Sequence, residues 1–95
     1  MTADELVATM RAALESERDA IRHLDADAVN AAAAAKEKVL DALKDAPASE
    51  RPALVAALGE LRGELRRNLV LLAHARDYLR ETAELFGRGR LEAKL

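Results

Sequence analysis

Apolar positions recur every three or four residues along most of the chain. In the first half the line of inward positions is Met10, Leu14, Glu17, Ile21, Leu24, Ala28, Ala31 and Ala35. Alternating steps of four and three residues form the seven-residue repeat of a helix that packs on another helix along one seam. Beyond Ala35 the line drifts to Val39 and Leu43. The pattern predicts one long helix over about residues 3–45.

Two short signals set the limits of this first helix. Thr2 is followed three residues later by Glu5, a spacing that lets each side chain accept a hydrogen bond from the other residue's backbone amide. At the other end, Pro47 cannot lie inside a helix, whereas Ser49 can cap a new helix and Pro52 is tolerated in its first turn. We therefore expect a loop at 46–49.

A second seam follows the loop with the same alternating steps. Its positions are Leu54, Leu58, Leu61, Leu65, Asn68, Leu72, Ala75, Leu79, Thr82 and Phe86. This seam predicts a second helix over about residues 50–86. Gly87 and Gly89 favour a helix end and a flexible tail over residues 87–95, in which "LEAKL" forms either a short third helical turn or a frayed end.

The composition agrees with a single helical domain over residues 1–95. The chain has 22 Ala and 16 Leu but only one Phe, one Tyr and no Trp, which is typical of helices and disfavours a sheet. A short loop makes consecutive helices antiparallel neighbours. The predicted fold is thus all-α, a long antiparallel two-helix hairpin that resembles a coiled coil.

Two long helices that touch along one stripe leave apolar side chains uncovered. On the second helix these are Leu69, Val70 and Leu71, and on the first they are Val29 and Leu40. A third helix, a second copy of the chain or a client protein must cover them. We expect self-association to complete a helical bundle, so that the chain is a homo-oligomer.

One polar residue lies on each seam, Glu17 on the first and Asn68 on the second. A buried asparagine can fix register and partner number in helix packing, and Asn68→Leu is then expected to stabilise the fold. A hairpin that folds about residue 48 keeps Glu17 and Asn68 apart and brings Glu17 near Arg76 or Arg80. The alternative is that Asn68 tilts toward solvent.

The sequence contains no recognisable catalytic, nucleotide-binding or metal-binding motif. There is no Cys, no nucleotide-binding glycine motif, no nucleophile motif and no pair of acids or histidines at metal-binding spacing, so we expect no enzyme, cofactor or metal. The arginines of residues 62–90 are interspersed with acids, which disfavours nucleic-acid binding. Neither a leader peptide nor a membrane span is visible, and we expect a cytoplasmic protein.

The order of landmarks resembles a known family. The stretch "LESERDAIRHLDADAVNAAAAAKEKVLDAL" is similar to the N-terminal helix of FlgN-like flagellar export chaperones, through Glu17, Ala20, Ile21, Leu24, Asp25, Val29, Lys36, Leu40 and Leu43. In the second helix, Asn68, Leu71 and Leu72 fit the latter half of the family's asparagine-containing stretch. Leu65 and Leu69 depart from it, where the family has asparagine and glycine.

The resemblance implies a cytoplasmic chaperone that binds flagellar hook-associated proteins, which form the hook-filament junction, and delivers them to the export apparatus. Family clients dock toward the C-terminal helix. The candidate partner-binding residues are Asn68, Leu69, Leu71, Leu72, Tyr78, Leu79, Leu85, Phe86 and Leu91. The alternative is a structural or regulatory coiled-coil module that homo-oligomerises without a client.

Overall fold

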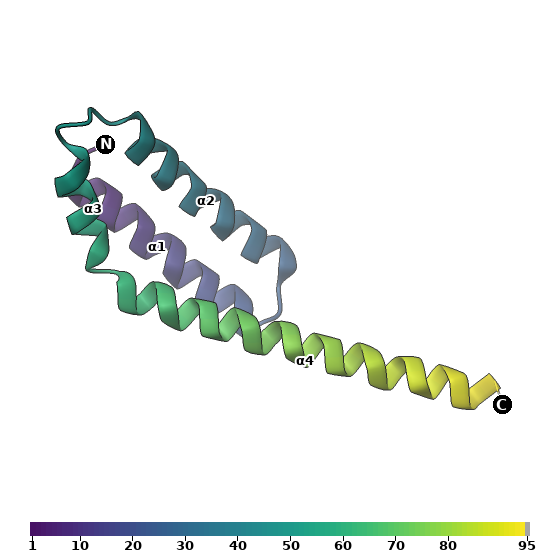
Figure 1. Ribbon diagram of the computed structural model, residues 1–95. Coiled ribbons are helices and arrows are strands. Elements are labelled where there is room, and N and C mark those ends of the chain that lie inside the picture. The colour runs from purple at the N-terminus through teal and green to yellow at the C-terminus, as the bar shows by residue number, and fades with distance from the viewer. Residues whose placement is uncertain (95) are drawn as a thin grey trace.

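The described part of the chain folds into four helices. The computed structural model describes the backbone of residues 1–94 and the side chains of residues 1–87. The helices are α1 (Ala3–Arg22), α2 (Ala26–Asp45), α3 (Arg51–Gly59) and α4 (Arg62–Lys94), and the described residues include no strand (Figure 1). The expected all-α class is confirmed, and the hairpin is made by α1 and α2.

Helix α1 lies at the centre of the bundle and contacts each of the other three helices. Helix α2 returns antiparallel to α1, whereas α4 runs in the same direction as α1 and continues far beyond its end (Figure 1). The molecule therefore measures 67 × 21 × 19 Å, with a bundle at one end and a single projecting helix at the other.

The predicted start of the first helix is confirmed. Glu5 N donates to Thr2 Oγ1, and Thr2 N donates to Glu5 Oε2, both at 3.2 Å. The loop that contains Pro47 also lies where it was expected, between Asp45 and Arg51. Ser49 is not the cap of the next helix, because Glu50 occupies that position without a capping side-chain hydrogen bond.

A single helix over residues 3–45 is wrong, because the chain reverses at residues 23–25. Leu24 adopts a left-handed conformation with φ 52°, and Asp25 N and Leu24 N donate to the carbonyl oxygens of Ala20 and Ile21. These two bonds form the Schellman motif that ends many helices. Asp25 then caps α2 by accepting a hydrogen bond from Ala28 N at 3.0 Å. One tight turn thus ends α1 and starts α2.

A single helix over residues 50–86 is also wrong. Glu60 and Leu61 form a turn between α3 and α4, and Leu61 N donates to Leu58 O at 3.0 Å. At the other end, α4 does not stop at Gly87 but extends to Lys94, so the helix end expected near residue 86 is wrong. Glycine lowers helix propensity by about 1 kcal/mol but keeps its backbone amide, so it does not by itself end a helix.

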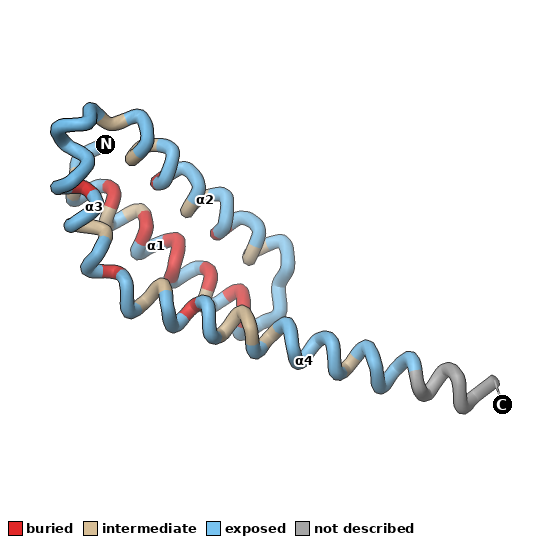
Figure 2. The backbone as a smooth tube through the Cα atoms, viewed as in Figure 1, coloured by how far each residue is buried: buried red, intermediate tan, exposed pale blue. Residues whose placement is uncertain are grey.

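The core forms where α1 meets the other helices. Its cluster of buried apolar side chains consists of Leu6, Met10, Leu14, Val39, Leu54 and Leu61. Burial falls off along α4, so that its projecting part is exposed almost throughout the residues whose side chains are described (Figure 2). No helix of the described chain has the length and apolar character needed to cross a membrane.

Candidate protein-binding surface

A cluster of three polar side chains connects three helices inside the bundle. Asn68 of α4 and Glu17 of α1 are only 1% and 2% exposed. The Asn68 amide donates to Glu17 Oε1 at 3.0 Å and to the backbone carbonyl of Leu14 at 2.9 Å. On the opposite side, Lys36 Nζ of α2 lies 2.6 Å from Glu17 Oε2. Both carboxylate oxygens of Glu17 therefore have a partner.

The arrangement of this cluster corrects two sequence expectations. Asn68 is buried, as predicted, but it contacts Glu17, from which it was expected to be separated. Glu17 pairs with Lys36 and not with Arg76 or Arg80. The side chain of Lys36 lies at the edge of the bundle and is 26% exposed. The cluster links α1, α2 and α4.

A continuous face of α4 carries apolar side chains along most of its length. It repeats every seven residues and consists of Leu71, Leu72, Ala75, Tyr78, Leu79, Thr82, Leu85 and Phe86, here called the α4 stripe. A face of this width is typical of a helix that packs into a bundle. The stripe extends the row of Leu61, Leu65 and Asn68, which is covered by α1.

The α4 stripe becomes uncovered where α1 ends. Leu71, Leu72 and Ala75 are still partly buried. Farther along, Tyr78 is 58% exposed, Leu79 51%, Leu85 66% and Phe86 70%. Thr82 donates its hydroxyl hydrogen to Tyr78 O at 2.8 Å, so this polar side chain is satisfied within its own helix. The uncovered part therefore presents large apolar groups together with the phenolic hydroxyl of Tyr78.

The structure separates the candidate binding residues into three groups. Asn68 lies in the interior, so it can bind no partner directly. Leu71, Leu72, Tyr78, Leu79, Leu85 and Phe86 belong to the α4 stripe, and Leu69 flanks it and is 67% exposed. Leu91 lies outside the residues whose side chains are described. Sequence reasoning missed Lys36, although its position one turn from Ala32 on a buried face was a usable signal.

A pocket of about 270 Å³ lies where the α4 stripe leaves the bundle. It is bounded by the turn between α1 and α2 and by the adjacent part of α4, and we call it the turn pocket. Its apolar lining comprises Ile21, Leu24, Ala26, Val29, Leu72, Ala75 and Leu79. Arg76 and Asn30 also line it. Leu24, which bears the left-handed backbone conformation, thus forms one wall of a pocket on the exposed stripe.

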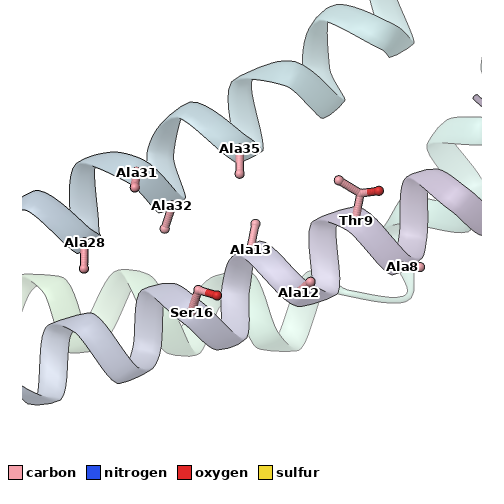
Figure 3. Close-up of a pocket in the computed structure, with 9 residues that line it drawn as sticks. All are labelled: Ala8, Thr9, Ala12, Ala13, Ser16, Ala28, Ala31, Ala32 and Ala35. Carbon is pink, nitrogen blue, oxygen red and sulfur yellow. The ribbon is translucent and has the colours of Figure 1, made fainter.

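A second, wider groove lies between α1 and α2. Its lining consists of alanines together with Thr9 and Ser16, and Ala13 of α1 points toward Ala35 of α2 across it (Figure 3). Ala13 and Ala32 are buried, whereas the other alanines of the lining are exposed or partly exposed. No charged side chain lines this groove, and its only polar side chains are the hydroxyls of Thr9 and Ser16.

No group of three His, Asp or Glu side chains within the described residues is placed to hold a metal ion. Comparison with known proteins gives no assignment either: no protein-family model, no curated protein and no solved structure matches the chain. The function must be argued from the surface itself.

Proposed function

We propose that this protein binds an amphipathic helix of a partner protein on the uncovered part of the α4 stripe. The observation that carries the proposal is the exposure of Tyr78, Leu79, Leu85 and Phe86 on one face of a single helix. Large apolar side chains grouped in this way mark interaction sites in soluble proteins. A helix that packs on another helix buries such a face through anchors spaced three, four and seven residues apart.

The bundle supplies the geometry for this binding. Helix α1 covers the first part of the same face, and a partner helix would continue its role after α1 ends. Because the cluster of Asn68, Glu17 and Lys36 fixes α4 against α1 and α2, the projecting segment is held in a defined direction. A partner covering Ala75 to Phe86 would contact about 17 Å of helix.

We further propose that the partner is a flagellar hook-associated protein and that the protein acts in the cytoplasm as its export chaperone. This more specific role is supported by the resemblance of residues 14–86 to FlgN-like chaperones. It also agrees with the unfinished character of the bundle, because a client helix can occupy the position that α1 leaves open. The proposal includes no reaction, cofactor or metal.

Titration of the protein with a synthetic peptide tests this function. The peptide covers the terminal helical segment of a hook-associated protein, and calorimetry measures its Kd. Leu79→Asp combined with Phe86→Asp should raise the Kd at least about 30-fold, because interface anchors of this kind dominate binding. Leu40→Asp is the matched control, since Leu40 is 46% exposed on α2, away from the stripe.

Three results would count against the proposal in different ways. Failure of the wild-type protein to bind the peptide would remove the flagellar assignment. Equal binding of an unrelated amphipathic helix would indicate that the protein binds amphipathic helices in general. Binding that survives both α4 substitutions but is lost on Leu40→Asp would place the site elsewhere.

A further inference from the structure

Two polar side chains line the otherwise apolar turn pocket, and both can donate hydrogen bonds. Arg76 comes from α4 and Asn30 from α2, so two helices bring these donors to one site. Both residues are exposed, and neither side chain has a hydrogen-bond or ion-pair partner among the described residues. No acidic side chain lines the pocket. The turn pocket therefore combines an apolar interior with donors that suit a carboxylate.

The neighbours of Arg76 along α4 leave its charge unbalanced. Side chains three and four positions apart lie beside one another on a helix. Arg76 has no acid at either spacing, and the residue four positions ahead of it is Arg80. Like charges at this spacing destabilise a helix. Arg80, by contrast, has Asp77 and Glu84 at these spacings. Of the two arginines, Arg76 is thus the one whose charge its own helix does not balance.

Two carboxylates near the turn do not compensate Arg76 either. Asp25 and Asp27 lie at the start of α2, but neither lines the turn pocket. Asp25 Oδ1 accepts a hydrogen bond from Ala28 N at 3.0 Å. Neither carboxylate forms an ion pair with Arg76. The guanidinium of Arg76 is therefore open to an acid from another molecule.

The end of α1 determines where a partner helix on the α4 stripe must stop. Helix α1 ends at Arg22, and the turn that follows it forms one wall of the turn pocket. Up to this point α1 packs against α4, and beyond it the stripe is uncovered (Figure 2). A partner helix on the uncovered stripe therefore has one end at the turn pocket. With a volume of about 270 Å³, the pocket can hold one large apolar side chain from that end.

We infer that the partner helix places its last apolar side chain in the turn pocket and an acidic side chain, within one turn of that anchor, on Arg76 and Asn30. The inference rests on the proposed function, because it names the chemistry of a helix that binds the α4 stripe. A carboxylate accepts two parallel hydrogen bonds from a guanidinium, and the Asn30 amide offers a further donor. The turn pocket thus selects among amphipathic helices, since a lysine in place of the acid would be repelled.

Calorimetric titration with three synthetic peptides tests the acidic side chain. The peptides are amphipathic, amidated at the C-terminus and identical on their apolar face. The flanking positions within one turn of each terminal leucine are Glu, Gln or Lys. The protein should bind the Glu peptide about fivefold more tightly than the Gln peptide, which is the upper range for an exposed ion pair, and the Lys peptide most weakly. Arg76→Glu should reverse this order. Amidation removes the terminal carboxylate, so the preference reports the side chains alone.

Arg80→Gln is the matched control for Arg76→Gln. Arg76→Gln should abolish the preference for the Glu peptide and leave the Kd of the Gln peptide unchanged, which isolates the pair of charges. Arg80→Gln should keep most of the preference. Circular dichroism of each variant checks that the helices remain folded. A preference that survives Arg76→Gln, or that Arg80→Gln removes equally, overturns the inference.

Ala26→Trp tests the apolar part of the pocket. Ala26 is exposed and lines the turn pocket, so a tryptophan there should fill the space and raise the Kd of the Glu peptide at least about tenfold. Ala33→Trp is the control, because Ala33 is an exposed alanine of the same helix that does not line this pocket. Unchanged binding by the Ala26→Trp variant contradicts the inferred anchor.

The same titrations separate this inference from the proposed function. If none of the three peptides binds the wild-type protein, helix binding on the α4 stripe is refuted together with the inference. If all three bind with equal Kd, helix binding stands and the role of Arg76 and Asn30 is refuted.

Discussion

The side-chain amide of Asn68 donates a hydrogen bond at 3.0 Å to Glu17 Oε1, and both residues are almost completely shielded from solvent. This contact joins α4 to α1. The same amide also donates to Leu14 O at 2.9 Å, so each of its two hydrogens has an acceptor. The orientation of the amide is set by these two acceptors, and the Asn68 Oδ1 atom accepts no hydrogen bond from the described residues.

Asn68→Leu should destabilise the protein by about 1–3 kcal/mol, because it leaves Glu17 Oε1 buried without its donor. The structure therefore reverses the expectation from sequence that this substitution would stabilise the fold. Chemical denaturation monitored by circular dichroism measures the change. In the double variant Glu17→Leu/Asn68→Leu, the loss should be smaller, since no buried carboxylate remains. An equal or larger loss in the double variant would show that the contact itself matters little.

Lys36→Met should lower the free energy of unfolding by about 2 kcal/mol at neutral pH. The substitution removes the cation that lies 2.6 Å from Glu17 Oε2 and leaves a buried charge with one neutral partner. Lys38→Met is the matched control, because Lys38 is exposed on the same helix and makes no ion pair with a described residue. Similar losses in the two variants would argue that Lys36 acts only through helix propensity.

The sequence identified the helical class, the N-terminal cap at Thr2 and the loop at Pro47, because each depends on local spacing. It missed the reversal at Leu24, because leucine gives no signal for a left-handed turn and the seven-residue repeat continues through it. The cap formed by Asp25 was the only local indication. Without the reversal, α1 was placed antiparallel to α4, and Glu17 was separated from Asn68. The exposed stripe residues were recognised because their periodicity does not depend on the connection between helices.

Leu24→Gly should stabilise the isolated protein by about 0.5–1 kcal/mol. A left-handed conformation costs a residue with a Cβ atom about 1–2 kcal/mol, and the gain is offset in part by the greater freedom of glycine in the unfolded chain. Leu40→Gly should instead destabilise the protein, since Leu40 has the same 46% exposure but lies inside α2. Thermal melting of both variants at low concentration checks the prediction. A lower melting temperature for Leu24→Gly would mean that its side chain contributes more than the strain removes.

Shortening the chain to end at Arg80 should leave the bundle nearly as stable as before. Leu85 and Phe86 are more than half exposed, so their removal takes little buried area from the bundle. The free energy of unfolding, measured by urea denaturation, should change by less than about 0.5 kcal/mol, which is the range typical of surface substitutions. A large loss of stability would instead show that the projecting part of α4 folds back onto the bundle in solution.

Tyr78 allows the central claim to be measured without a label, because the chain has no Trp and Tyr78 is its only Tyr. Acrylamide quenching of tyrosine fluorescence reports how freely solvent reaches this position on the α4 stripe. At high dilution, Tyr78 should be quenched nearly as strongly as a free tyrosine amide, and quenching should fall as protein concentration rises or a partner helix is added. The account is contradicted if quenching is weak at the highest dilution and changes neither with protein concentration nor with the partner helix. The stripe would then already be covered by its own chain.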